Sequence, residues 1–105
     1  MEVLSLTQEP SQIVKTVLSG QYQVQILIQQ KRQGLFVDVN LDGVDIVTSV
    51  IALNETPIIS REYLGFPGNL LFIDLNGKDD PVYNQFNDRF NLIYLDAEEY
   101  ELVRK

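Results

Sequence analysis

The stretch QYQVQILIQQKRQGLFVDVNLDGVDIVTS, residues 21–49, decides the fold. From Tyr22 onward, apolar residues fall at every second position and glutamines lie between them. The apolar set is Tyr22, Val24, Ile26 and Ile28, and the amide set is Gln21, Gln23, Gln25 and Gln29. A period of two places the two sets on opposite faces of a β-strand, so we expect one buried face and one face of amides. Only Leu27 interrupts the alternation.

Two turn signals divide this stretch into three consecutive strands. The polar segment 30–34 (QKRQG) suits a loop of a few residues, after which Phe36 and Val37 begin the return strand. Asp42-Gly43 is a strong hairpin signal, because a tight primed turn needs positive φ and this pair tolerates it. Residues 44–50 then form the third strand, and the stretch predicts a β-meander.

Further strands are predicted on both sides of the meander. Residues 2–7 suit an opening strand, and residues 12–18 fit a helical face but are rich in β-branched residues, which favour a strand. The apolar run 70–75 suits a strand that is covered on both faces. The longest loop is predicted over residues 78–88, and residues 89–95 alternate as a strand does. The last segment, 96–105, fits either one turn of helix or a final strand. Seven or more short strands predict an all-β fold: a small antiparallel β-sandwich or barrel built on a β-meander, in one domain over residues 1–105.

The composition excludes several classes of function. The chain of 105 residues is 45% hydrophobic, which is enough for a real core. It contains no cysteine and no histidine, so it lacks disulfides, thiolate metal ligands and the commonest general base. Fifteen acidic against eight basic residues give a net charge of −7, which disfavours nucleic acids and anionic membranes as partners. No signal-peptide pattern occurs and no apolar window approaches the ~20 residues that span a bilayer, so we expect a soluble chain.

The same composition argues against catalysis. The acidic pairs Asp79-Asp80 and Glu98-Glu99 could be imagined as general acid and base. Adjacent acids on a strand point to opposite faces, and acids in loops are usually solvated. No histidine or cysteine can complete such a site, so we expect no enzyme activity, no catalytic residues and no cofactor.

The sharpest local motif offers oxygen ligands at alternate positions, as a calcium-binding loop does. Its residues are Asp38, Asn40, Asp42 and Asp45, with Gly43 at the sixth position. The twelfth position is Ser49, where such a loop needs a bidentate glutamate, and the predicted flanks are strands rather than helices. The interpretation as the solvent face of a strand that enters an Asp-Gly hairpin fits better. A free-standing calcium- or ligand-binding β-barrel module remains the alternative function.

Two features are candidates for contact with a protein partner. The amide row of Gln21, Gln23, Gln25 and Gln29 is uncharged, whereas a solvated strand face usually carries lysine and glutamate. Such a row is either plain surface or part of a protein–protein contact, where charge is depleted. Phe66, in the segment Gly65-Phe66-Pro67-Gly68, is either an exposed aromatic of a binding loop or a turn residue packed into the core, and burial is the default for aromatics.

Several short motifs occur in a fixed order along residues 20–96. They are Gly20-Gln21-Tyr22, Arg32, Phe36 with Asp38, Asp42-Gly43, Pro67-Gly68-Asn69-Leu70, Asp79-Asp80-Pro81 and Leu92-Ile93-Tyr94-Leu95. In this order and spacing the chain resembles the baseplate plug proteins of contractile-tailed phages, a family described from a cyanophage. It departs from the family pattern at Gln29 and Gln30, where the family commonly has an aromatic and an asparagine, and at Leu35-Phe36, where it favours tryptophan.

The resemblance implies a structural part of the virion without enzyme activity. Such a part would be made in the host cytoplasm and would lie at the distal end of the tail, between the tube and the central spike or hub, closing the lumen until infection. It would act through contacts with other phage baseplate proteins. Phage assemblies are symmetric, so a homo-oligomer with copies in threes or sixes is expected. A strand edge could be completed by a neighbouring chain.

Overall fold

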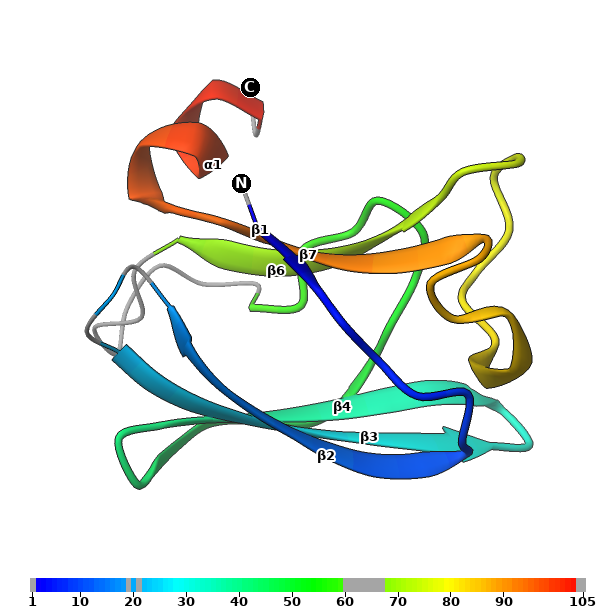
Figure 1. The fold of residues 1–105 in the computed structure, drawn as a ribbon, viewed down its shortest axis with the longest axis horizontal. Coiled ribbons are helices and arrows are strands. Elements are labelled where there is room, and N and C mark those ends of the chain that lie inside the picture. Colours follow the sequence, from blue (N-terminus) through cyan, green and yellow to red (C-terminus); the bar gives the residue numbers. More distant parts are fainter. Residues whose placement is uncertain (1, 19, 21, 60–67, 104–105) are drawn as a thin grey trace.

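The protein is a sandwich of two antiparallel β-sheets, as the computed structural model shows for residues 2–18, 20, 22–59 and 68–103 (Figure 1). One sheet has the order β2-β3-β4-β5 and the other the order β1-β7-β6. The strands are β1 (Glu2–Leu4), β2 (Ser11–Leu18), β3 (Tyr22–Lys31), β4 (Gly34–Leu41), β5 (Val44–Ile51), β6 (Asn69–Asp74) and β7 (Phe90–Leu95). A 3₁₀ turn, η1 (Tyr83–Gln85), precedes β7, and the helix α1 (Ala97–Val103) follows it. The predicted all-β class is confirmed, in its sandwich form and not as a closed barrel.

The four-stranded sheet is the predicted meander, preceded by β2. Its alternation is the reason for its burial pattern: Val24, Ile26 and Ile28 are at most 3% exposed, while Gln23 and Gln25 between them are exposed. Asp42 and Gly43 form the turn between β4 and β5, with φ of 50° and 90°, as the Asp-Gly signal predicts. The hairpin between β3 and β4 is tighter than expected.

That tighter hairpin corrects the prediction of a loop over residues 30–34. β3 continues to Lys31 and β4 begins at Gly34, so only Arg32 and Gln33 form the turn. Gln30 lies on the same side of β3 as Ile26 and Ile28, which face the core. Its side-chain Oε1 accepts a hydrogen bond of 3.2 Å from the backbone N–H of Tyr83. A polar residue at an inward position is thus satisfied by a distant part of the chain.

The three-stranded sheet is buried more completely than the meander. β6 and β7 carry buried residues on both faces, as predicted for the apolar run 70–75. On the side away from the core, Leu71, Ile93 and Leu95 form a second apolar cluster, against which Tyr100 of α1 packs. On the core side, the rings of Phe72 and Phe86 stack with their centroids 5.7 Å apart. A sheet with two covered faces is therefore held from both sides.

The first strand is shorter than expected, and in the last segment the helical alternative is the one that forms. β1 ends at Leu4 instead of continuing to Thr7, because the Asn87 side chain bonds both backbone groups of Leu6 and the Gln12 side chain bonds those of Thr7. At the other end, residues 97–103 are helical. The Asp96 carboxylate accepts the N–H of Glu99 at 2.8 Å and the Glu99 carboxylate accepts the N–H of Asp96 at 3.1 Å, which is a capping box. In the part of the chain that the structure describes, no helix has the length and apolar character to cross a membrane.

Two polar side chains fasten the loops of the three-stranded sheet. Asn69, 1% exposed, accepts the N–H groups of Ile59 and Leu70 and donates to the carbonyl of Ile59 at 2.6 Å. The Asp74 carboxylate accepts two hydrogen bonds of 2.8 Å from the Arg89 guanidinium. Arg89 also donates to Asp79 at 2.6 Å. Ion pairs of Arg89, the residue before β7, thus join it to the end of β6 and to the turn that follows β6.

Gly68, immediately before β6, lies where no side chain fits. Its φ is +91°, and a Cβ atom placed on it would lie 1.9 Å from the carbonyl oxygen of Leu95 and 2.7 Å from the carbonyl carbon of Asp96. The backbone of residue 68 therefore packs directly on the end of β7. The close contact between residue 68 and the end of β7 explains the glycine of the Pro-Gly-Asn-Leu motif, and the hydrogen bonds with Ile59 explain its asparagine.

Candidate functional site

The predicted amide row lies on the outer face of the four-stranded sheet. Gln23 and Gln25 are exposed and Gln29 is half-buried, all on the side of β3 opposite the core. Gln21 lies outside the described residues. Within the described part of the chain, the side chains of Gln23 and Gln25 have no hydrogen-bond partner, so their amide groups are available to a second molecule.

The strand register adds apolar residues to these amides. Leu27 is opposite Ile13 of β2 on one side, and Gln29 is opposite Phe36 of β4 on the other. Because residues opposite each other in an antiparallel sheet point to the same face, they form one surface. We call it the amide face, and its central residues are Ile13, Gln23, Gln25, Leu27, Gln29 and Phe36. Lys15, opposite Gln25, and Asp38, opposite Leu27, lie on the same face.

The apolar part of the amide face is well exposed on β2. Ile13 is 56% and Val17 is 51% exposed, whereas Leu27 and Phe36 are half-buried. The ammonium of Lys31 lies 5.2 Å from the centre of the Phe36 ring, a cation–π contact at the border of the face. Sequence reasoning found the glutamines but missed Ile13 and Phe36, since their place on this face follows from the register. The one visible signal was Leu27, the apolar residue that interrupts the alternation.

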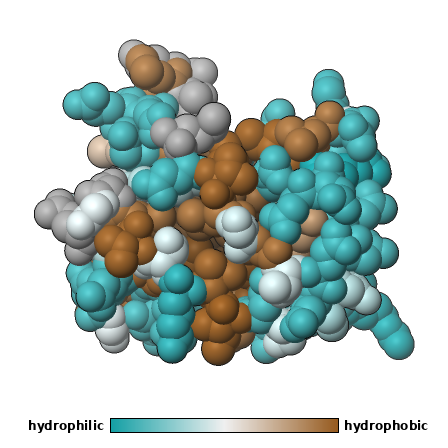
Figure 2. Space-filling view, viewed as in Figure 1, coloured by the Kyte–Doolittle hydropathy of each residue, from teal (hydrophilic) through white to brown (hydrophobic). Residues whose placement is uncertain are grey.

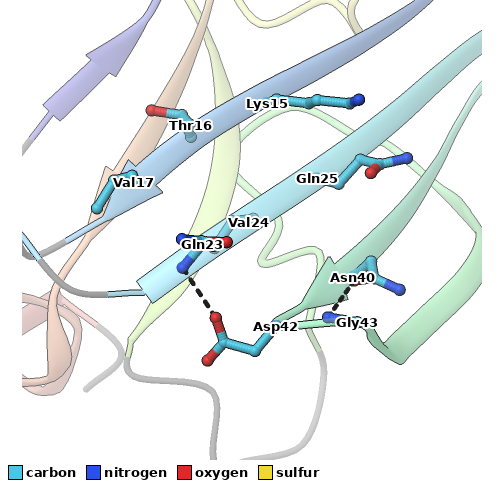
Figure 3. A pocket seen from close by; sticks show the side chains of 9 residues that line it. All are labelled: Lys15, Thr16, Val17, Gln23, Val24, Gln25, Asn40, Asp42 and Gly43. Carbon is cyan, nitrogen blue, oxygen red and sulfur yellow. Dashed lines mark hydrogen bonds between the residues drawn. The ribbon is translucent and has the colours of Figure 1, made fainter.

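A hollow of about 460 Å³ lies at one end of the amide face, beside the Asp42-Gly43 turn. Figure 3 shows Lys15, Gln25 and Asn40 side by side on β2, β3 and β4, in agreement with their register. The Lys15 ammonium has no ion-pair partner among the described residues. Amides, one ammonium and the apolar edge of Val17 give this hollow the mixed chemistry of a protein-binding surface.

The four residues weighed as calcium ligands bond the backbone or one another. Asp42 accepts the N–H of Gln23 at 3.1 Å, Asn40 accepts the N–H of Gly43 at 2.9 Å, and Asp38 accepts the N–H of Ser49 at 2.7 Å. The Asn40 amide donates to Asp45 at 3.1 Å. Across the described ranges, no three acidic side chains gather as a metal ion would need. Each of these side chains thus has a role in the turn or in the irregular β4–β5 pairing.

The remaining candidates take no part in the amide face. Phe66 lies outside the described residues. Asp79 is bound to Arg89, Asp80 accepts the N–H of Asn54 at 2.9 Å, and Glu99 caps α1. Three of the four acidic residues thus hold loops or a helix end.

A comparison of the sequence with known protein families identifies the family of the chain. Residues 1–98 match the family described as "Cyanophage baseplate Pam3 plug gp18". No protein with a curated description matches the chain. The match covers all seven strands and the outer face described above. The chain belongs to the family of cyanophage baseplate plug proteins.

Proposed function

We propose that this baseplate plug component holds its place through protein–protein contacts made by the amide face. As a member of the family, the chain is a part of the virion, in the baseplate of the phage tail, and it interacts with other baseplate proteins. We assign these contacts to Gln23, Gln25 and Gln29 and to the apolar residues between them. Gln21 and Phe66, the other sequence candidates, belong to the same proposal.

The observation that carries the proposal is the uncharged row that β3 contributes to the middle of the face. The chain has a net charge of −7, yet the outward residues of β3 from Gln23 to Gln29 are uncharged. The flanking strands place one cation and one anion beside this row, Lys15 opposite Gln25 and Asp38 opposite Leu27. Charged side chains desolvate at high cost, so the buried centre of an interface is depleted in them. An outer strand face made only to be solvated would carry lysine and glutamate at these positions.

The partners we propose are the tail tube and the central hub or spike, the neighbours of a part that closes the distal end of the tube. We also propose a symmetric homo-oligomer, because identical parts around a tail axis are related by rotation. The chain would have no catalytic activity. Its lack of histidine and cysteine supports this, as does the use of its acidic pairs in structural bonds.

The test introduces one negative charge at the centre of the amide face. Gln25→Glu should fold normally, because Lys15 lies directly opposite residue 25 and opposite charges on paired strands are tolerated. In the assembled baseplate the new carboxylate would be buried. We expect at least roughly tenfold fewer copies per particle, measured by quantitative mass spectrometry of phage complemented with the variant.

The matched control is Gln85→Glu, the same chemical change at an exposed residue of η1. It should enter particles at the wild-type level. Equal incorporation of both variants would remove the amide face from the interface. The same particles give the copy number of the wild-type chain: three or six per virion supports the symmetric plug, whereas tens to hundreds would assign the chain to the tube, sheath or capsid.

A further inference from the structure

The outer edge of β2 presents a row of unused backbone hydrogen-bond groups. The backbone N–H of Gln30 donates to the carbonyl of Pro10 at 2.6 Å, so this pair is a hydrogen-bonded one. Hydrogen-bonded and non-hydrogen-bonded pairs alternate in an antiparallel ladder, and the β2–β3 register is continuous from Ser11 to Leu18. The even-numbered residues of β2 therefore bond β3, and the odd-numbered residues point their N–H and C=O groups away from the sheet.

These outward groups belong to Ser11, Ile13, Lys15 and Val17. Among the residues that the structure describes, none of the four has a backbone partner on the outer side. The free edge is therefore eight residues long, regular and without a proline between Ser11 and Leu18. A strand edge of this kind is a template for pairing with another chain.

The other strand edges are protected in ways that β2 is not. Along β6, the segment after β5 covers the edge: the N–H of Glu55 bonds Phe72 and the N–H of Ile58 bonds Leu70, both at 2.8 Å. β5 pairs irregularly with β4 and contains Ser49 at a φ of 52°, which breaks a flat template. β1 is only three residues long. Short strands, bulges, covering loops and lysines are the usual devices against edge pairing, and in the described part of the chain only Lys15 acts in this way on β2.

Apolar side chains accompany the open edge. In Figure 2 hydrophobic residues form a band across the middle of the molecule, on the side where Figure 1 shows β1 and β2 in front. Val3 of β1 is 56% exposed, and Ile13 and Val17 of β2 are exposed to a similar degree. An added strand would cover apolar surface and satisfy backbone groups at the same time.

We propose that an extended segment of another baseplate protein adds to β2 as the fifth strand of this sheet. The inference rests on the proposed function, since it supplies the way in which a neighbour in the baseplate is held. The segment would carry apolar residues beside Ile13 and Val17 and a carboxylate beside Lys15, the cation without an ion-pair partner in the described part of β2. A second copy of β2 fits less well, because β2 contains no acidic residue and both copies carry a net charge of −7.

The test removes one outward N–H group while leaving the ladder inside the sheet intact. Ile13→Pro deletes the backbone donor that points away from β3, a position where proline is tolerated in edge strands. The chain should still melt cooperatively, but we expect at least a tenfold loss of copies per phage particle. The comparison variant, Ile13→Ala, shortens the same side chain and keeps the N–H, so its loss of copies should be at least threefold smaller than that of Ile13→Pro.

Other results would overturn the inference. Normal incorporation of Ile13→Pro would mean that no strand uses this edge, and equal losses for Ile13→Pro and Ile13→Ala would assign the contact to the side chain alone. Dimerisation of the isolated wild-type chain that Ile13→Pro abolishes would make a second copy the occupant. If Ile13→Pro does not fold, amide exchange of the wild-type chain decides: the N–H groups of Ile13, Lys15 and Val17 should exchange at least tenfold more slowly in particles than in the isolated chain, and equal rates would contradict the proposal.

The edge and the amide face can fail separately. If particles contain few copies of Ile13→Pro but a normal number of copies of Gln25→Glu, the proposal of strand addition stands and the amide face is not part of the interface. The reverse pair of results would keep the face and remove the edge. Normal incorporation of both variants would overturn both proposals.

Discussion

The two sheets of the sandwich use their outer sides differently. The three-stranded sheet has its outer side partly covered, with Tyr100 of α1 packed on Leu71, Ile93 and Leu95, and its loops are fastened by buried polar side chains. The four-stranded sheet has one buried face, while its other face carries amides, half-buried apolar residues and an open edge. The comparison teaches that the two sheets differ in how much of their outer side the rest of the described chain covers, and the proposed contacts lie on the less covered sheet.

The largest effect is expected from Gly68→Ala, which tests whether the three-stranded sheet is the rigid partner. The added Cβ would lie 1.9 Å from the Leu95 carbonyl oxygen, and backbone atoms cannot give way as a side chain end can. We expect the free energy of unfolding to fall by more than about 4 kcal/mol, measured by urea denaturation. Gly43→Ala is the control, because its φ is also positive but no atom lies within 4 Å of the added Cβ. Its cost should be about 1 kcal/mol, and similar costs for the two variants would contradict the role of the close approach.

A second pair of variants compares the two faces of β3. Ile28 is fully buried and Leu27, the next residue, is half-buried on the amide face. Ile28→Ala should cost about 3 kcal/mol because it leaves a cavity in the core. Leu27→Ala should cost less than about 1 kcal/mol in the isolated protein, since its side chain still contacts water. Equal costs in thermal melts would mean that the amide face is as tightly packed as the core.

The hairpin at the end of the amide face should respond to backbone strain alone. Gly43 has a φ of 90° and open space around it, so a substitution acts through its conformation. Gly43→Val should lower stability by about 2 kcal/mol, because a β-branched residue is strained at positive φ. An unchanged melting temperature would contradict the turn geometry assigned to Asp42 and Gly43.

Acid should weaken the three-stranded sheet through Asp74. The Arg89 guanidinium, by its hydrogen bonds to the carboxylate, holds the pKa of Asp74 well below its usual value of 3.8; burial opposes this, and the N–H groups of Asp79 and Asn76 assist it. Because the folded-state pKa is depressed, the stabilisation is complete above the unfolded-state pKa and is lost as the pH falls through the lower, folded-state value. Thermal melts should show stability declining below about pH 4, and Asp74→Asn should flatten that decline. A decline of the same steepness in Asp74→Asn would assign acid sensitivity to other carboxylates.

The smallest effect is expected from calcium on the amide face. Asp38 and Asn40 already accept hydrogen bonds from the backbone of the β4–β5 hairpin, and Asp42 accepts one from the backbone of β3. Millimolar calcium should therefore leave the melting temperature unchanged. A site of micromolar affinity would instead add about 4 kcal/mol of stability, and such a shift would return the calcium-binding module to consideration.

The regular part of the fold could be predicted because its signals are local. Alternation over residues 22–28 predicts which side chains of β3 are buried, and Asp42-Gly43 predicts its hairpin. The capping box of Asp96 and Glu99 was also readable, since the two residues are three positions apart, as such a box requires. The sequence-based prediction for residues 96–105 stayed open between helix and strand, because it did not use this capping signal.

The rest depended on contacts between distant residues. Gln30 stays in its strand because of Tyr83, and β1 ends early in part because Asn87 binds Leu6. The amide face was half predicted: the outward side of β3 follows from its own alternation, but Ile13 and Phe36 join it only through the register with β2 and β4. Register is set by the whole sheet, so no single strand encodes its neighbours.

The sheet order also has a consequence for the route by which the chain folds. The meander joins only strands that follow one another, so β2 to β5 can pair as soon as Ile51 has left the ribosome. β1 pairs only with β7, and Glu2 meets Tyr94, almost the full length of the chain away. Loop closure over that distance must wait for the last strand. We therefore expect the four-stranded sheet to form during synthesis, and the three-stranded sheet to complete the sandwich afterwards.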